Sequence, residues 1–289
     1  MLLSNLFASL YQFADVFSFL VLSAAGLAVI FGMMGVINMA HGEFIMCGVY
    51  VTAAANHSGL PLPLAQACGT LVAFIVGMLL EIALIRPLYT RPLDSLLVTW
   101  GLSLVITQGT LILVGSTFPG VGTPLGGFDV GVYSFSTYRV VLFVAALAVL
   151  GFVWFLFMRT RFGVHARAVM QNASMAQALG VRRSRIYALS FGVGAGLAGL
   201  CGALYAPTMS LIPTMGASFI VEAFVTVVVG GSSVLLGTAP AALVLAIIRS
   251  GLNAWYGQII GQIGLLVAVI LIIRVLPDGF TGWLAKRSA

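Results

Sequence analysis

Long runs of apolar residues, separated by short stretches rich in glycine, proline and polar residues, dominate this chain. Nine runs can be followed, of which the second, seventh and eighth are short: 16–36, 43–56, 64–85, 95–114, 139–158, 186–206, 219–235, 238–252 and 257–275. As an α-helix, the first run would reach about 30 Å, the thickness of the hydrocarbon core of a bilayer. None of the runs alternates as the strands of a membrane β-barrel do. The pattern therefore predicts an all-α, polytopic helical bundle with eight or nine membrane crossings, some of them short or broken.

Composition places these helices in a membrane. Hydrophobic residues make up 61% of the 289 positions, only 7% are charged, and the mean hydropathy is +1.14. A soluble protein could not cover its surface with so few polar groups. We therefore predict that residues 1–289 form a single transmembrane domain. The cysteines Cys47, Cys68 and Cys201 lie far apart without metal-ligand spacing, so we expect them to pack in apolar surroundings and expect no metal site.

The basic residues predict the orientation of the bundle. If 159–185 is cytoplasmic and every apolar run crosses the membrane, then 86–94 and 274–289 are cytoplasmic as well. Together these stretches carry 11 of the 13 Lys and Arg residues, and such an excess is typical of cytoplasmic loops. We expect the N-terminus outside and the C-terminus in the cytoplasm. An even number of crossings is the alternative, and it would put 274–289 outside unless one run is re-entrant.

The stretch 159–185 is the most informative polar part of the chain. It contains six arginines, one histidine and no acidic residue. Its middle, 170–179, is uncharged, rich in alanine and methionine, and too short to span a membrane. We predict a short helix with a small-residue face, ended by Gly180, that docks against a cytoplasmic partner. For the arginines alone, the alternative is an anchor beside acidic membrane lipids.

The motifs of enzymes are incomplete in this chain. There is no G-x-x-x-x-G-K-[ST] phosphate loop, so ATP hydrolysis by that route must occur on another subunit. Residues 194–199 match the dinucleotide pattern G-x-G-x-x-G, but they lie in an apolar run with no preceding strand. We interpret their small side chains as a helix-packing surface. His41 and Glu43 match half of a zinc deaminase signature whose cysteine half is missing. We predict no catalytic residue, no cofactor and no nucleic-acid partner.

Three polar residues, Asn38, His41 and Glu43, lie together between the first two apolar runs. One interpretation is a turn at the cytoplasmic ends of two helices, in which Asn38 provides a cap and Glu43 is stabilised by the helix dipole. The other is a helix broken within the membrane, whose freed backbone and polar side chains line a solute pathway. The two interpretations are compatible if the turn forms an inner gate.

Charged residues within other apolar runs need partners, because an ionisable group is costly in a bilayer. Glu222 and Arg249 should lie at similar depth in neighbouring helices, so we predict an ion pair between them. This pair either faces the pathway or only ties the two helices together. Glu81 lies within reach of Arg86 or Arg91 at the end of the third run.

A second break interrupts the seventh run, where two glycines and two serines follow a β-branched stretch. Interrupted hydrophobic segments often mark a solute site in transporters. Ser232 and Ser233 therefore either line the pathway or belong to a plain turn between the seventh and eighth runs. The complete set of pathway or gate residues that we predict is Asn38, His41, Glu43, Glu222, Arg249, Ser232 and Ser233.

Five segments carry a resemblance to a known family: GVINMAHGEF (35–44), RTRFGVHARAVMQNASMAQALGV (159–181), ALSFGVGAGLAGLCGAL (188–204), VVVGGSSVLLGT (227–238) and LPDGF (276–280). In this order they resemble the membrane permeases of branched-chain amino acid ABC importers. Within that family the resemblance is greatest to the permeases of urea and short-chain amide importers. It covers most of the chain, from about residue 16 to 284.

The resemblance implies a permease in a bacterial inner membrane and several partners. These are a second, homologous permease, two cytoplasmic ATP-binding subunits, a periplasmic or extracellular solute-binding protein, and membrane lipid. The segment that matches 163–183 is expected to couple the permease to an ATPase. The expected coupling residues are Arg161, Gly163, Arg167, Asn172, Ala176, Leu179, Gly180, Arg182 and Arg183.

The solute is predicted less sharply than the type of protein. Neutral hydrogen-bonding groups and few net charges along the predicted pathway favour a small neutral or zwitterionic solute, and the resemblance favours urea or a short-chain amide. A branched-chain amino acid is the alternative within the same family. A passive channel for a small solute is the alternative from another class, and it would need no ATPase.

Overall fold

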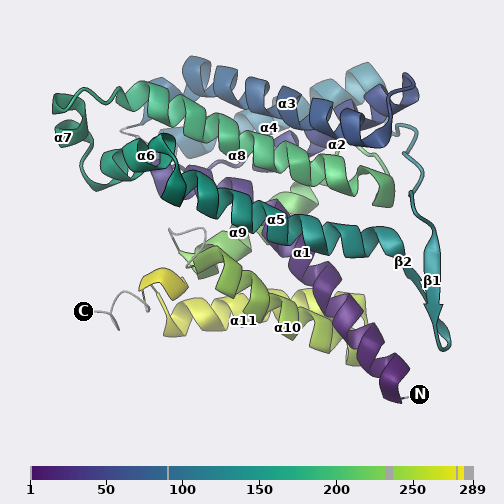
Figure 1. The fold of residues 1–289 in the computed structure, drawn as a ribbon. Helices are drawn as coiled ribbons and strands as arrows, with labels where there is room; N and C mark the ends of the chain where they lie inside the picture. The colour runs from purple at the N-terminus through teal and green to yellow at the C-terminus, as the bar shows by residue number, and fades with distance from the viewer. Residues whose placement is uncertain (1, 90, 232–236, 278, 283–289) are drawn as a thin grey trace.

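The computed structural model describes residues 2–89, 91–231, 237–277 and 279–282 (Figure 1). Its helices are α1 (Leu2–Met34), α2 (His41–His57), α3 (Leu62–Leu80), α4 (Pro92–Val114), α5 (Thr137–Arg159), α6 (Arg161–Gln171), α7 (Ala173–Ala178), α8 (Arg183–Tyr205), α9 (Met215–Gly230), α10 (Ala239–Tyr256) and α11 (Gln258–Val275). A π-helical turn (Glu81–Ile85) and a 3-10 turn (Arg86–Leu88) extend α3, and another 3-10 turn (Ala206–Thr208) extends α8. Strands β1 (Gly127–Val130) and β2 (Tyr133–Ser136) form an antiparallel hairpin.

Each of the nine apolar runs corresponds to one helix, namely α1 to α5 and α8 to α11. Six of these nine helices, with their extensions, are long and apolar enough to cross a membrane: α1, α3, α4, α5, α8 and α11. The predicted polytopic helical bundle is confirmed. The second and seventh runs are short as helices too, with 17 residues in α2 and 16 in α9. The sequence analysis assigned no element to the hairpin, whose strands have four residues each.

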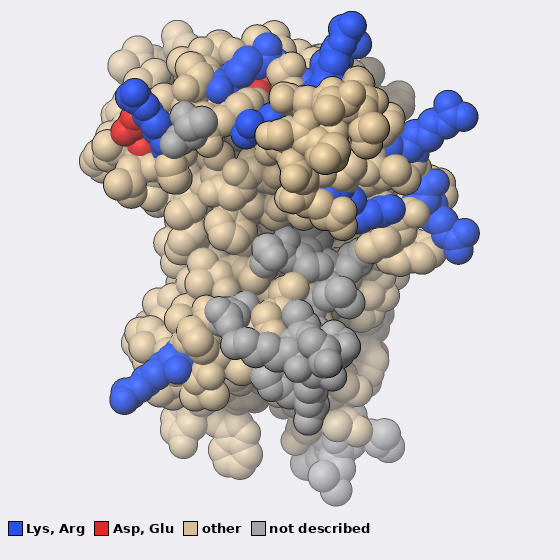
Figure 2. Space-filling model, turned by 90° about the vertical axis from the view of Figure 1, so that its left-hand side faces the viewer, with Lys and Arg blue, Asp and Glu red and all other residues tan. Residues whose placement is uncertain are grey.

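The nine helices run in alternating directions between two ends of the bundle (Figure 1). The hairpin end carries β1, β2 and the start of α1. The basic end carries α6, α7 and nine of the eleven arginines that the structure describes: Arg86, Arg91, Arg159, Arg161, Arg167, Arg182, Arg183, Arg185 and Arg274. Figure 2 looks onto the basic end, where basic side chains gather in the upper part and few acidic ones are visible. The described arginines of the three basic stretches therefore lie at one end, as their predicted common side of the membrane requires.

Helix α1 passes diagonally through the middle of the bundle (Figure 1). It packs against α5 and α8 on one side and against α9 and α10 on the other, while α2 and α3 cover α8. As a result, 83% of the residues in the most apolar stretch of α1 are buried, and the same share in that of α8. In α4 the share is 6%. The interior of the protein is thus organised around α1 and α8, and α4 lies at its edge.

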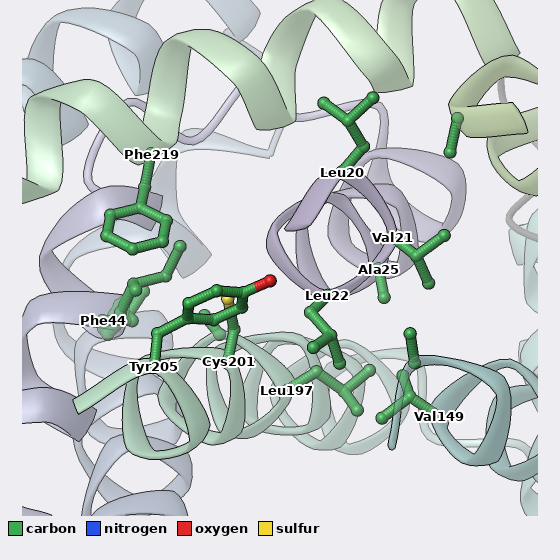
Figure 3. Close-up of a cluster of buried hydrophobic side chains, with 14 of the residues drawn as sticks. Leu20, Val21, Leu22, Ala25, Phe44, Val149, Leu197, Cys201, Tyr205 and Phe219 are labelled. Atoms are coloured by element: carbon green, nitrogen blue, oxygen red, sulfur yellow. The ribbon is translucent and has the colours of Figure 1, made fainter. Parts of the chain in front are cut away.

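Large apolar side chains fill the space where α1, α2, α8 and α9 meet (Figure 3). Leu20 and Leu22 of α1 are fully buried, and Phe44 of α2 and Phe219 of α9 lie near the Tyr205 ring. Cys201 of α8 is buried in this cluster, as expected for a packing cysteine, whereas Cys68 is exposed. Within the described residues there is no group of three or more potential metal ligands.

The small residues of α8 allow its neighbours to approach closely. A Cβ atom added to Gly199 would lie 2.3 Å from the Cβ of Ala73 in α3, and one added to Gly194 would lie 2.7 Å from the carbonyl oxygen of Gly26 in α1. Such contacts occur where helix backbones pack directly on one another in lipid. The glycine pattern at 194–199 is therefore a packing surface, as predicted.

Candidate functional site

The stretch between α1 and α2 is an irregular segment in which Val36, Asn38 and Ala40 are buried. Helix α1 ends where Gly35 adopts a positive φ of 65°, and residues 35–40 form no regular helix. Asn38 is 1% exposed, and its side-chain oxygen accepts a hydrogen bond from the amide of Ala40 at 3.1 Å. Glu43 lies in the first turn of α2, near the positive end of the helix dipole. The Asn38 side chain thus closes a turn just before α2 without capping the helix, whose N-cap residue is Ala40, and Glu43 has the predicted position near the helix dipole.

This break lies deep in the bundle. The Nε2 atom of His41, the first residue of α2, lies 2.9 Å from the carbonyl oxygen of Ser23. Ser23 precedes the end of α1 by eleven residues, which corresponds to about 16 Å along the helix. The segment 35–40 therefore runs back along α1, and α2 begins well inside the basic end. This depth fits the second interpretation of the segment, in which the helix is broken within the membrane.

A row of hydroxyl groups on α4 faces the break. Ser95, Thr99, Ser103 and Thr107 follow one another at four-residue spacing and so lie on one face of the helix. The Thr99 hydroxyl oxygen accepts a hydrogen bond from the amide of Met39 at 3.1 Å. The hydroxyls of Ser103, at 2.9 Å, and of Thr107 both donate to the Glu43 carboxylate. We call these four residues the hydroxyl stripe; the break and this stripe together form the candidate pathway site.

Several polar atoms at the break have no hydrogen-bond partner among the described residues. They are Nδ2 of Asn38, Nδ1 of His41 and Oε2 of Glu43, and all three are buried. Because His41 Nε2 faces a carbonyl oxygen, it must donate, so Nδ1 of the neutral ring is an acceptor. The site thus offers two free acceptors and one free donor. Buried polar groups are rarely left unpaired in folded proteins, and such groups are available to a polar ligand.

The predicted ion pair between Glu222 of α9 and Arg249 of α10 is present, and both side chains are largely buried. A second pair that the sequence analysis did not predict joins Asp15 of α1 to Arg139 of α5 at 2.5 Å. Asp15 also interacts electrostatically with Arg249. Positive and negative charges therefore alternate across four helices in the order Arg139, Asp15, Arg249, Glu222. This network ties α9 and α10 to the central helix α1.

Two predictions about polar residues in the apolar runs remain: the partner of Glu81, and the place of Ser232 and Ser233. Glu81 pairs with Arg86, one of its two expected partners, at 3.4 Å, whereas Arg91 pairs with Asp94. Ser232 and Ser233 lie outside the described residues. Just before them, α9 ends at Gly230, whose carbonyl oxygen accepts a hydrogen bond from the Thr281 hydroxyl at 2.6 Å.

The basic stretch 159–185 folds into two short helices instead of one. Thr160 caps α6 by accepting a hydrogen bond from the amide of Gly163 at 3.2 Å, and Asn172 caps α7 by accepting one from the amide of Met175 at 2.9 Å. The Asn172 cap interrupts the predicted continuous helix because its backbone is extended. The predicted end at Gly180, where φ is +88°, is present.

Two of the small residues of this stretch point inward, while the expectation that the stretch docks on a partner stays a prediction. Ala166 and Ala176 are buried against α1 and α8, together with Val169. The outer surface instead carries larger apolar side chains, with Met175 60% and Leu179 80% exposed. Met175 and Leu179 thus form an exposed apolar surface at α7 and its C-cap.

The predicted coupling residues divide into buried and exposed groups. Gly163 and Ala176 are buried, and Arg167 is half-buried and donates a hydrogen bond to the carbonyl oxygen of Phe157. The exposed group consists of Arg161, Asn172, Leu179, Gly180 and Arg182, while Arg183 is half-buried over two tyrosine rings. The exposed members lie in or beside α6 and α7, at the basic end of the bundle.

The fold and the site define a multi-pass membrane protein with a broken helix and unpaired polar groups in its interior, features that belong to transport proteins. Sequence comparison identifies the particular family. The profile of the branched-chain amino acid transport system permease component matches residues 9–276, and the chain belongs to this family. It is therefore a permease of the ABC importer type and not an enzyme.

Individual relatives extend over nearly the whole chain. The permease protein LivH of a high-affinity branched-chain amino acid transport system from Salmonella typhimurium is 28% identical over 282 residues, covering 90% of each chain. BraD, the corresponding permease from Pseudomonas aeruginosa, is also 28% identical and covers 90% of this chain and 91% of its own. The ribose import permease RbsC from Haemophilus influenzae is 25% identical over 77% of this chain and 69% of its own. No solved structure matches this chain.

Proposed function

We propose that this chain is a permease subunit of an ABC importer for branched-chain or similar small amino acids, and that the solute passes between the start of α2 and the hydroxyl stripe of α4. The observation that carries this proposal is the set of unpaired polar atoms on Asn38, His41 and Glu43 within the bundle. The names of the relatives LivH and BraD support the amino acid as solute. These names therefore favour a branched-chain amino acid, the alternative solute, over the urea or short-chain amide that the sequence favoured.

The charge of Glu43 also favours an amino acid over urea. Glu43 is 4% exposed, accepts hydrogen bonds from two hydroxyls, and has no ion-pair partner among the described residues. A carboxylate in such a place is costly without a nearby cation. The ammonium group of an amino acid supplies that cation, and the free donor Asn38 Nδ2 can bind its carboxylate. Urea supplies no cation, so the buried Glu43 carboxyl would have to take up a proton when urea binds.

In this proposal the basic end faces the cytoplasm, since the positive-inside rule assigns clustered arginines to that side. Two ATP-binding subunits would dock there, on the outer surface of α7 and its neighbours. A second, homologous permease and an extracytoplasmic solute-binding protein complete the importer. The exposed apolar side chains of Met175 and Leu179 support this location, because they lie in α7 and at its C-cap, beside several arginines.

The pathway is tested by leucine uptake into proteoliposomes that contain the complete importer. We expect Glu43→Gln to reduce uptake about tenfold or more, because a hydrogen bond to a charged group contributes about 1.5–3 kcal/mol. Ser103→Ala, which removes one donor to the carboxylate, should have a smaller effect in the same direction. Gln108→Ala is the control, since Gln108 is an exposed polar residue of α4 outside the hydroxyl stripe. Undiminished uptake by Glu43→Gln at normal abundance would exclude the pathway.

The docking surface is tested by copurification of the ATPase with this permease. Leu179→Asp places a charge on the exposed apolar surface of α7, so we expect the ATPase to be lost from the purified complex. Val132→Asp makes the same type of change at the hairpin end, where Val132 is 83% exposed, and should leave the complex intact. Retention of the ATPase by Leu179→Asp would place the docking surface elsewhere.

A further inference from the structure

A second polar site lies at the basic end, apart from the candidate pathway. It is a cavity of about 610 Å³ between the 3-10 turn after α3 and the segment that leads from α7 into α8. Its polar lining residues are Arg86, Tyr89, Gln177, Arg182, Arg183 and Ser184. The cavity is open to the surroundings of the protein and contacts neither the break nor the hydroxyl stripe.

Three lining residues bury hydrogen-bond donors that have no acceptor among the described residues. These donors are Nε–H of Arg86, the hydroxyl of Tyr89 and Nε–H of Arg183. Unpaired buried donors are rare, and here three of them belong to residues that line one cavity. A ligand with several acceptor oxygens would satisfy them together.

The guanidinium group of Arg183 is held in place before any ligand binds. It lies 4.9 Å from the ring centroid of Tyr187 and 5.5 Å from that of Tyr89. The two rings are perpendicular, with their centroids 4.9 Å apart. Arginine bound over aromatic faces keeps its N–H groups directed and loses little further freedom when it binds an oxygen ligand. The cavity is thus preorganised.

The charge of the cavity favours an anion. Arg86, Arg182 and Arg183 contribute three positive charges, and the one acidic group nearby is Glu81, which pairs with Arg86 at 3.4 Å. Two positive charges therefore remain without an acidic partner in the described structure. At the start of α8, the amides of Arg185 and Ile186 donate to the carbonyl oxygen of Arg182, so only those of Arg183 and Ser184 can face a negatively charged group.

The location of the cavity identifies the source of the anion. Arg86 lies at the end of the membrane span Leu62–Leu88, and Arg183 lies at the start of the span Arg183–Thr208. The cavity therefore lies where the headgroups of one leaflet meet the protein. On the membrane side of these arginines, Ile82 of the π-helical turn and Leu189 of α8 remain 44% and 41% exposed. A phospholipid has an anionic group for the arginines and acyl chains for these apolar positions.

We propose that this cavity binds the phosphate group of an anionic phospholipid from the leaflet at the basic end. Arg183 and the Tyr89 hydroxyl bind phosphate oxygens, and Arg86 contributes its free Nε–H while it remains paired with Glu81. A bound lipid then connects the end of α3 with the segment between α7 and α8. This role is independent of the identity of the transported solute.

The test is native mass spectrometry of the purified importer after exchange into phosphatidylcholine nanodiscs, with and without added phosphatidylglycerol. We expect retained phosphatidylglycerol on the wild-type permease and about tenfold weaker retention by Arg183→Gln, in line with the loss of a charged hydrogen-bond donor. Tyr89→Phe keeps the ring below Arg183 and removes only the hydroxyl, so it should fold normally and weaken retention about threefold. Arg185→Gln, which changes an exposed arginine outside the cavity, is the matched control.

Three results would overturn the proposal. Equal retention by wild type, Arg183→Gln and Tyr89→Phe would mean that lipid does not use this cavity. Displacement of phosphatidylglycerol by millimolar-range inorganic phosphate would identify a site for a free anion. The third result is that the permease alone retains phosphatidylglycerol but the complex with the ATPase does not. It would mean that acidic residues of the ATPase, and not a lipid, occupy the cavity in the importer.

Discussion

At the scale of single residues, the contact between α2 and α8 depends on glycine. A Cβ atom added to Gly202 would lie 1.9 Å from the carbonyl oxygen of Ile45, and one added to Gly48 would lie 2.1 Å from the carbonyl oxygen of Gly199. Backbone atoms on α2 and α8 thus touch without intervening side chains. This contact holds α2 in the interior of the bundle, where its first residues form the candidate pathway site.

Gly202→Ala should therefore destabilise the permease. The added methyl group meets backbone and not a movable side chain, so the helices must separate, at a cost of about 1–3 kcal/mol. A thermal unfolding experiment on the purified complex should show a lower midpoint. Gly101→Ala is the control, because a Cβ atom at Gly101 of α4 would have no neighbour within 4 Å. Equal midpoints for both variants would contradict the close contact.

The ion pair between Glu222 and Arg249 should contribute more to the stability of the folded protein than an exposed ion pair does. Removing one partner leaves a buried charge, which costs about 3–5 kcal/mol in soluble proteins. We expect Glu222→Gln and Arg249→Gln each to lower the unfolding midpoint, and the double variant to lose less than the sum of the two. Neutralisation is preferable to charge exchange, because Asp15 would repel a carboxylate at position 249.

The matched control for this cycle is the pair between Arg91 and Asp94, whose side chains are 74% and 48% exposed. Its removal by Asp94→Asn should change stability by less than about 1 kcal/mol. Strict additivity of Glu222→Gln and Arg249→Gln would show that the two residues do not interact.

At the scale of helices, the apolar runs predicted the elements well because run length and hydropathy are local properties of the sequence. The nine runs became nine helices, and Gly180 ended the basic stretch as predicted. The cap at Asn172, which divides α6 from α7, could have been predicted from the preference of asparagine for helix starts. The four-residue spacing of Ser95, Thr99, Ser103 and Thr107 was a similar local signal that was missed.

The cap at Asn172 should determine how well α7 is ordered. With six residues, α7 is too short to be stable alone, so losing the hydrogen bond to the Met175 amide should cost about 1 kcal/mol. We expect Asn172→Ala to raise hydrogen exchange of the α7 amides about fivefold and to weaken stimulation of the ATPase by solute. Gln171→Ala changes the exposed neighbour outside the cap and should do neither. Normal exchange in Asn172→Ala would show that packing of Ala176 alone orders the helix.

At the scale of the whole molecule, the properties that the sequence did not reveal are those that depend on distant segments. The depth of the break follows from the contact of His41 with Ser23 and from the return of 35–40 along α1. The pairing of Asp15 with Arg139 joins residues 124 positions apart, and no local pattern indicates it. The inward direction of Ala166 and Ala176 likewise depends on Met33 and Ile186, which belong to other helices.

We propose that this permease serves an ATP-driven importer of a branched-chain amino acid. The most direct measurement is uptake of radiolabelled leucine and of radiolabelled urea by proteoliposomes that contain both permeases and the ATPases, with the solute-binding protein added. We predict that leucine accumulates only when ATP is present and that urea does not accumulate. Accumulation of urea in place of leucine, or leucine flux that is equally fast without ATP, would contradict the claim and favour a urea importer or a passive channel.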